Sequence, residues 1–225
     1  MLKLILAAVL AFGAPAALKA QASFKMLAPA QGYALYNARE YPVMLSGAVF
    51  SFGMSSVHLK LYQGYVKSTN ALLQRLKELE GENKTASPEY AELKRRFGWE
   101  FNGMRLHELY FSNLGAAPLP AGSSLRAALT AQYGTFEAWE ASFQALAQLR
   151  GIGWAALVYD APAGRFHNVW INEHDGGVPA GTTVLLVLDL FEHAYMYDFQ
   201  TDKLRYARAF WAAVNWAEVQ KRFGK

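Results

Sequence analysis

The sequence predicts an α+β fold, in which an N-terminal helical hairpin is followed by a C-terminal domain with a three-stranded antiparallel sheet and helices. In the first half, apolar side chains recur at helical spacing, as in Val57, Leu61, Tyr65 and Leu72. After residue 150 the pattern changes to short, β-branched apolar runs that are separated by turn residues. Helices followed by a group of strands are typical of α+β domains.

The composition indicates a globular protein. The chain has 225 residues, of which 53% are hydrophobic and 18% charged, so it has the apolar surface that a disordered chain lacks. It contains no cysteine, which excludes a disulfide-stabilised miniprotein. The net charge of +4 is spread along the chain without a long basic run, so we expect no nucleic acid partner.

The first 22 residues are predicted to be a secretory signal peptide. Lys3 precedes an apolar stretch over 4–18, and the small residues Ala20 and Ala22 flank Gln21. The apolar stretch is shorter than the ~20 residues of a membrane span, although a membrane anchor or a buried helix stays an alternative. No later stretch is long and apolar enough to span a bilayer. We therefore expect cleavage after Ala22 and a periplasmic or secreted protein, in which the lack of cysteine avoids unwanted disulfides.

Residues 23–115 are expected to form an N-terminal arm and the helical hairpin. The segment 81–88 is rich in turn-forming residues and separates the helices, and Ser51 is a suitable helix cap. The expected segments are, in chain order, an irregular arm over 23–49 and helices over 51–79, 89–96 and 101–114.

Residues 116–225 are expected to form the C-terminal domain. Thr135 is a suitable helix cap, and the segment 160–164, Asp-Ala-Pro-Ala-Gly, is typical of a hairpin turn. We expect the three strands to form a meander, in which consecutive strands pair. The expected elements are helices over 124–133 and 135–149, strands over 154–159, 165–171 and 182–188, and a final helix over 206–223.

The segment Asp189-Leu-Phe-Glu-His193 is the strongest sign of chemistry in the sequence. An apolar strand over 184–188 places Asp189 in the interior, where a carboxylate is costly unless it meets a cation or a hydrogen-bond donor. An imidazole four residues later allows a mixed oxygen and nitrogen metal site, but an ordinary Asp–His hydrogen bond explains the same two residues. The chain lacks a nucleophilic cysteine and a G-x-S-x-G motif, and Gly151-Ile-Gly153 is interpreted as a turn rather than a phosphate loop.

Longer blocks around these residues resemble the iron/manganese superoxide dismutases. Residues 185–199 and 206–219 are similar to the C-terminal signature of that family, which contains a D-x-W-E-H-A-Y-Y motif and a W-x-x-V/I-N-W-x-x-V pattern. Three further segments are similar in the same order, namely Gln63-Gly-Tyr65-Val66, His107-Glu-Leu-Tyr-Phe-Ser-Asn113 and Gly151-Ile-Gly153-Trp154. The resemblance covers about residues 50–222.

The resemblance implies a metal site, a substrate and a partner subunit. The metal would be iron or manganese, with zinc less expected, and the substrate would be superoxide. Tyr65 matches a tyrosine near the metal-bound solvent, and Trp154 matches a tryptophan that walls the cavity. Glu192 matches a glutamate that reaches a ligand histidine of the partner subunit, which implies a homodimer. Three of the four implied metal ligands are His107, Asp189 and His193.

The first ligand of the family departs from the pattern here. In the family it is a histidine eight residues before the tyrosine, a position that Val57 holds, while His58 is the next residue. Adjacent helical positions differ by ~100° in direction, so His58 would bind the metal only if the helix were rotated, bulged or shifted. Leu61 and Met196 replace a hydrogen-bonded His–Tyr pair of the family. We interpret them as an apolar pair that favours the register with Val57 at the ligand position.

The residue that contacts metal-bound solvent is also changed. One of its two positions in the family is Gly103 here, and the other lies in the loop after the hairpin, which reads Asn172-Glu-His174-Asp175. We predict that His174 takes this role, with an exposed loop histidine as the alternative. Phe111 replaces a tryptophan of the family's cavity.

Two functions are consistent with this pattern. The first is metal-dependent superoxide dismutation, by one-electron redox cycling of iron or manganese, in an exported protein. The second is a superoxide-dismutase-like protein with lost or altered catalysis and a metal-binding or structural role. The retained His107, Asp189, His193 and Tyr65 favour the first function. The changes at Val57, Leu61 and Met196 are the reason to keep the second as the alternative, because outer hydrogen bonds tune a redox metal.

Overall fold

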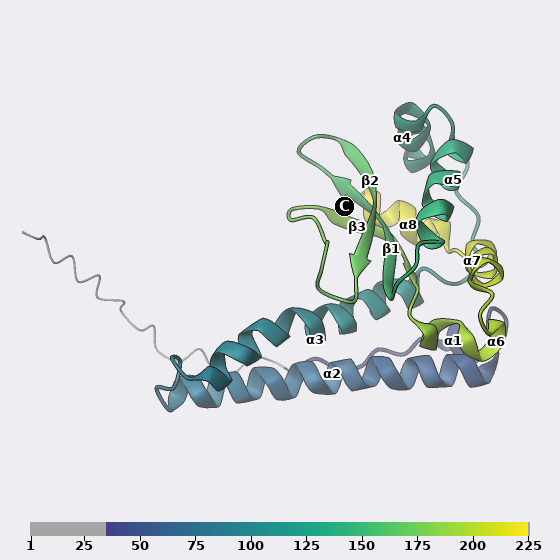
Figure 1. The fold of residues 1–225 in the computed structure, drawn as a ribbon. Helices are drawn as coiled ribbons and strands as arrows, with labels where there is room; N and C mark the ends of the chain where they lie inside the picture. The colour runs from purple at the N-terminus through teal and green to yellow at the C-terminus, as the bar shows by residue number, and fades with distance from the viewer. Residues whose placement is uncertain (1–34, 225) are drawn as a thin grey trace, which may run out of the picture. The chain divides into compact units, whose positions relative to one another are not determined.

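Two long helices form the hairpin that the sequence predicts (Figure 1). The structure is a computed structural model that describes residues 35–224, so the predicted signal peptide over 1–22 lies outside the described residues. Helix α2 spans Phe52–Gly81 and helix α3 spans Pro88–Ser112, and the two pack against each other along their length. The predicted cap is confirmed, since the Ser51 hydroxyl accepts a hydrogen bond from the Met54 amide at 3.1 Å.

Helix α3 is continuous, so the expectation of two separate helices over 89–96 and 101–114 is wrong. The expected break lies around Gly98, which costs a helix about 1 kcal/mol relative to alanine. The surrounding side chains offset this cost. The rings of Phe97 and Phe101 stack one turn apart with centroids 5.2 Å apart, on either side of Gly98.

The three strands form an antiparallel sheet with the order β2-β1-β3. They span Gly153–Asp160 (β1), Arg165–Asn172 (β2) and Thr183–Asp189 (β3). The expected meander is therefore wrong, because β1 and not β2 lies in the centre. The first six residues of β1 are buried, whereas β2 alternates between exposed and buried positions, as suits an edge strand. The β1–β3 register pairs Trp154 with Asp189 at the end of the sheet.

Six further helices and one 3₁₀ turn complete the described chain. They are α1 (Pro42–Leu45), α4 (Ser124–Tyr133), α5 (Phe136–Ala147), η1 (Glu192–Ala194), α6 (Met196–Phe199), α7 (Lys203–Ala212) and α8 (Trp216–Phe223). The Thr135 cap of α5 is confirmed by a 2.9 Å bond from the Ala138 amide. Among the described helices, none has both the length and the apolar character that crossing a membrane requires.

The final helix expected over 206–223 is instead two helices. The chain leaves the helical path at Val214, which forms an isolated bridge with Leu114, and the Asn215 amide donates to the Asn113 carbonyl at 2.6 Å. The Asn215 side chain then caps α8 by accepting from the Glu218 amide. Contacts with the end of α3 therefore override a helical pattern that is continuous in the sequence.

The core lies between the sheet and the helices that cover it. Helices α3 and α8 contact β3, and α5 contacts β1 and β2. Arg222 of α8 is buried and donates to the Asn113 side chain at 2.6 Å and to the Leu185 carbonyl at 2.8 Å, which ties α8, α3 and β3 together. Arg222 thus fixes the positions of these three elements relative to one another. The predicted boundary between residues 115 and 116 stays a prediction.

Candidate metal centre

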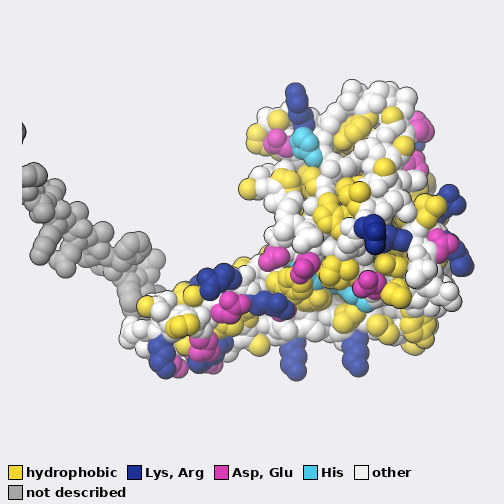
Figure 2. Space-filling model, in the orientation of Figure 1, with side chains coloured by type: hydrophobic (Ala, Val, Ile, Leu, Met, Phe, Trp, Pro, Cys, Tyr) yellow, Lys and Arg dark blue, Asp and Glu magenta, His cyan; other side chains and the backbone are white. Residues whose placement is uncertain are grey.

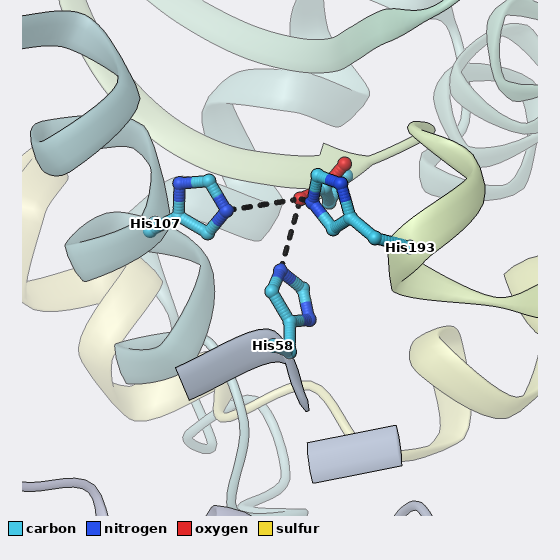
Figure 3. Close-up of side chains that lie close together, drawn as sticks. His58, His107 and His193 are labelled. Atoms are coloured by element: carbon cyan, nitrogen blue, oxygen red, sulfur yellow. Dashed lines mark hydrogen bonds and ion pairs between the residues drawn. The ribbon is translucent and has the colours of Figure 1, made fainter. Parts of the chain in front are cut away.

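Four side chains from three parts of the fold converge at one point. His58 comes from α2, His107 from α3, Asp189 from the end of β3 and His193 from the 3₁₀ turn that follows. Figure 3 shows the three imidazoles directed at one carboxylate oxygen. One ligand atom from each residue lies within 4.8 Å of the others.

The cluster is centred on Oδ2 of Asp189. This oxygen lies 3.1 Å from His58 Nε2, 3.2 Å from His193 Nε2 and 3.6 Å from His107 Nε2. The other oxygen, Oδ1, accepts a hydrogen bond from the Phe191 amide at 2.9 Å, which fixes the orientation of the carboxylate. Three imidazole nitrogens and one carboxylate oxygen therefore face the same small volume.

Burial sets the charge of these groups. His58, His107 and Asp189 are fully buried, whereas the His193 side chain is 19% exposed. Burial lowers the pKa of His58 and, more strongly, that of His107, so both imidazoles are neutral near pH 7. Burial alone would raise the pKa of Asp189, but the adjacent His193 and His58 hold it below its usual range. Neutral imidazoles and an ionised carboxylate are the forms that bind a metal ion.

The donor set fits a transition-metal ion, and His107 gives the clearest sign of it. Its Nδ1–H donates to the Gly103 carbonyl at 2.5 Å, so its Nε2 carries a free lone pair. That buried Nε2 has no hydrogen-bond partner among the described residues. An unpaired buried acceptor is costly, and a metal ion at this point would satisfy it. Imidazole and carboxylate together suit iron and manganese.

The structure decides which of two adjacent residues belongs to the site. His58 is buried in the cluster, whereas Val57 is 44% exposed, so the register with Val57 at the ligand position is wrong. A spacing of seven residues falls about 20° short of two helical turns, which puts His58 and Tyr65 on one face of α2. With a spacing of eight residues, Val57 lies about 80° away from that face. Helix α2 is regular throughout and needs no bulge for this geometry.

The interpretation of Leu61 and Met196 as an apolar pair stays a prediction, but the register that it was taken to favour is wrong. Their exposed fractions are 39% and 46%, so both lie on the surface of the described chain. The side chain one turn after His58 is Tyr62, which is buried and donates to Glu108 at 3.1 Å. The changes at Val57, Leu61 and Met196 therefore leave the four-residue cluster intact.

Tyr65, His174 and Trp154 lie beside the cluster and are linked by hydrogen bonds. The His174 Nε2 and the Tyr65 hydroxyl oxygen are 2.7 Å apart, and the Trp154 indole N–H donates to His174 Nδ1 at 3.1 Å. The Tyr65 ring stacks on His107 with centroids 5.3 Å apart, and Trp154 meets the same imidazole edge-on at 5.0 Å. His174 is fully buried, so the alternative of an exposed loop histidine is wrong.

Sequence reasoning missed the residues that hold His174 in place. Phe191 stacks on its ring with centroids 4.6 Å apart, and Trp99 meets it edge-on at 5.0 Å. The Asn102 amide donates to the His174 carbonyl at 3.0 Å. Asn102 lies one residue before Gly103 on α3, but nothing in the sequence pairs it with a loop 72 residues away.

Two glycines and one aromatic residue shape this region. A Cβ at Gly103 would lie 2.5 Å from the Tyr65 ring, so only glycine allows the ring to occupy its place. Gly153, the first residue of β1, has a φ of +152°, and a Cβ there would lie 2.1 Å from the Ile171 carbonyl oxygen, so only glycine fits at this position. Phe111 is buried and meets His58 edge-on with centroids 5.0 Å apart, so it walls the cluster as expected.

The fold and the cluster together define a class of protein. An α+β chain encloses three histidines and one aspartate around a single position, and a hydrogen-bonded tyrosine and histidine lie next to it. This arrangement is that of a mononuclear transition-metal protein.

Comparison with known proteins identifies the family. The pattern of the iron/manganese superoxide dismutases, C-terminal domain, matches residues 120–222. An iron superoxide dismutase of Saccharolobus solfataricus is 32% identical over 169 residues, which cover 73% of this chain and 80% of that protein. A manganese superoxide dismutase of Mycolicibacterium smegmatis is 34% identical and covers 74% and 80%, respectively. An iron superoxide dismutase of Methanothermobacter thermautotrophicus is 36% identical and covers 74% and 82%. The chain belongs to the iron/manganese superoxide dismutase family, and its metal is iron or manganese.

Proposed function

We propose that the protein catalyses the dismutation of superoxide at one iron or manganese ion held by His58, His107, Asp189 and His193. The observation that carries this proposal is the unpaired, buried Nε2 of His107, which faces the carboxylate and the other imidazoles. Hydrogen bonding within the protein leaves this nitrogen unsatisfied, so a purely structural role for the cluster does not explain it.

A bound iron or manganese ion would supply the redox chemistry, since such an ion can exchange single electrons with superoxide. The sum is two superoxide ions and two protons converted to dioxygen and hydrogen peroxide. The protein has to orient the ligands, keep bulk water away and deliver two protons. The Gly103 carbonyl and the Phe191 amide, which hold His107 and Asp189, perform the first task.

Tyr65, His174 and Trp154 are proposed as the residues that deliver protons and wall the cavity. Burial, together with the Asp189 carboxylate, raises the pKa of Tyr65 to about 12, so this phenol keeps its proton near pH 7. A protonated phenol next to the ligands can donate a hydrogen bond to an anion such as superoxide. On the face in Figure 2, acidic and basic side chains are interspersed and no extended patch of one charge is visible.

We also propose a homodimer in which Glu192 reaches a ligand histidine of the partner subunit. Glu192 is exposed and precedes His193, the only partly exposed residue of the cluster. The N-terminal end of α2 and helix α6 lie together here, since Asp198 accepts from the Ser51 amide at 2.7 Å. Exposed apolar side chains on these two helices would be buried in a dimer, and they are Phe52, Val57, Leu61, Met196 and Tyr197. Sedimentation of the purified chain tests this, and Tyr197→Glu is expected to shift the protein to the monomer.

Export and removal of residues 1–22 remain part of the proposal. The apolar stretch over 4–18 and the Ala20-Gln21-Ala22 segment support it. The test is to express the full chain in a bacterium and to determine the mass and N-terminus of the protein in each cell fraction. A periplasmic product that begins at Ser23 is expected, and a cytoplasmic product that begins at Met1 would contradict export.

The central experiment measures metal content and superoxide loss in one preparation. The full chain is purified after growth with iron or with manganese, its metal is quantified, and superoxide decay is followed with free metal at equal concentration as the control. We expect about one iron or manganese per chain, activity above the control, and loss of both in His107→Ala. A correctly folded, metal-loaded protein without activity above the control would reject dismutation and leave the metal site standing.

A further inference from the structure

We propose that a cavity between the N-terminal arm, α3, α8 and the start of β3 binds a phosphate group, as the free ion or as a phosphate monoester, through the guanidinium groups of Arg39 and Arg105. The site is separate from the metal centre and independent of the proposed dismutation. The cavity has a volume of about 420 Å³, within the range of about 300–1,000 Å³ that is usual for small-molecule sites. Its charged lining residues are Arg39, Arg105, Glu108, Glu218 and Arg222.

Arg39 and Arg105 share one carboxylate oxygen. Arg105 Nη1 donates to Oε2 of Glu108 at 2.6 Å, and Arg39 Nη1 lies 3.7 Å from the same oxygen. The other oxygen of Glu108, Oε1, accepts from the Tyr62 hydroxyl at 3.1 Å. Because the carboxylate is buried and fixed by these partners, it holds the two guanidiniums beside each other. Two positive charges therefore face one negative charge at the wall of the cavity.

Both guanidiniums keep N–H groups for a ligand, since each carries five donors. Within the described part of the chain, the Arg39 side chain makes no hydrogen bond, and Arg105 donates only to Glu108. The Arg105 guanidinium also lies over the rings of Tyr36 and Phe101, at 4.9 and 5.4 Å from their centroids, which orients its plane. A planar fork held in this way matches two oxygens of a phosphate group.

The backbone of Arg39 is anchored, although its side chain is 64% exposed. The Arg39 amide donates to the Tyr62 hydroxyl at 2.9 Å. Three residues earlier, the Tyr36 amide donates to the Asn70 side-chain oxygen at 2.9 Å, and the Asn70 side-chain amide donates to the Tyr36 carbonyl at 2.8 Å. These bonds hold the arm on α2. The Arg39 guanidinium can therefore close over an anion from a fixed point at the mouth of the cavity.

The remaining charged residues of the cavity are paired within the protein. Arg222 donates to the Asn113 side chain, to two backbone carbonyls and to the Ser112 hydroxyl, so it contributes charge rather than free donors. Glu218 lies 3.3 Å from Lys221 Nζ and 3.5 Å from Arg222 Nε, which compensates its charge. The lining carries three guanidiniums and two carboxylates, an excess of one positive charge, so it attracts an anion.

The cavity is distinct from the metal centre. None of the four cluster residues lines it. Glu108 directly follows His107 on α3, but side chains one position apart on a helix differ by about 100° in direction. Thr183, which also lines the cavity, begins β3 and Asp189 ends it, a separation on the order of 20 Å at ~3.3 Å per residue. A phosphate group in this cavity would leave the metal position unoccupied.

Titration calorimetry of the metal-loaded full chain with sodium phosphate tests the site. We expect one binding event that sodium chloride at equal ionic strength does not reproduce, and that Arg39→Gln weakens about tenfold or more. This variant keeps the anchor on Tyr62, because that bond uses the backbone amide. The control is Arg95→Gln, which removes a 72% exposed arginine from α3 and is expected to leave phosphate binding unchanged.

Three results would overturn the proposal. If the unaltered chain bound neither inorganic phosphate nor glycerol 3-phosphate, the cavity would not be a phosphate site. Phosphate binding that Arg39→Gln does not weaken would place the anion elsewhere, for instance at the metal ion. An equal loss in Arg39→Gln and Arg95→Gln would show attraction to the general surface charge.

A parallel titration with glycerol 3-phosphate distinguishes the two sources of the phosphate group. Tighter binding than that of inorganic phosphate indicates a monoester, whose organic part fills the rest of the cavity, and equal or weaker binding indicates the free ion. None of these measurements uses superoxide, so their outcome is independent of whether the protein catalyses dismutation.

Discussion

The ring of Tyr65 lies so close to the backbone of Gly103 that the two residues depend on each other. A Cβ at position 103 would lie between 2.5 and 2.9 Å from three ring carbons of Tyr65. These carbons belong to the body of the ring, so a small rotation of the side chain does not relieve the clash. Gly103 also accepts, through its carbonyl, the hydrogen bond from His107 Nδ1. One glycine on α3 therefore fixes both a proposed ligand and a proposed proton donor.

Gly103→Ala is expected to displace Tyr65 and break its hydrogen bond with His174, which lowers superoxide turnover about tenfold or more. The same substitution changes the free energy of unfolding in two opposite ways. Alanine has the higher helix propensity, which stabilises α3, whereas the clash with Tyr65 destabilises the fold. The control is Gly98→Ala on the same helix, where a Cβ has an ordinary 3.5 Å contact with Asp175. Steady-state kinetics and thermal unfolding of both variants check this. Equal activities of the two variants would contradict the proposed role of Tyr65.

Alanine variants of His58 and Val57 provide a second comparison between a site residue and a matched control. His58→Ala removes a buried imidazole from the cluster and is expected to lower the metal content of the purified protein far below one ion per chain. Val57→Ala changes a side chain that is 44% exposed and is expected to keep the metal. Metal analysis by mass spectrometry checks both variants. If His58→Ala kept the metal and Val57→Ala lost it, the register with Val57 at the ligand position would be supported instead.

Arg222→Met is expected to destabilise the fold by about 2–4 kcal/mol, because it leaves several buried acceptors unpaired. Arg222 donates to the Asn113 side chain and to the Leu185 and Leu109 carbonyls, at 2.6, 2.8 and 3.2 Å. Urea unfolding measures the change. Arg95→Met is the control, since the Arg95 side chain is 72% exposed and its removal is expected to cost under about 0.5 kcal/mol.

The pKa of His174 predicts how the stability of the metal-free protein depends on pH. Burial lowers this pKa to about 4 in the folded chain, below the ordinary value of 6.5. Between these two values the unfolded chain binds more protons, so the free energy of unfolding falls as pH decreases through this window. His58 and His107 contribute in the same direction. We therefore compare the chain with His174→Gln in urea at pH 7 and pH 5, and expect the variant to lose less stability. An equal loss in both would show that His174 is protonated in the fold.

The sequence by itself determined the class of fold and most of the metal centre. Helical and strand periodicities reflect which face of each element is buried, so they predicted the hairpin, the sheet and two helix caps without tertiary information. His107, Asp189 and His193 were found because each lies in a block whose order and spacing match a known family, and the structure brings all three together.

Tertiary contacts decided those features of the fold and the site that the local sequence pattern does not encode. The rotation of α2 about its axis, which selects His58 over Val57, depends on what packs against the helix. The central place of β1, the break at Val214 and the burial of His174 likewise depend on segments far away in the sequence. Local spacing fixes where side chains lie relative to their own helix or strand, but only packing fixes where that helix or strand lies relative to the others.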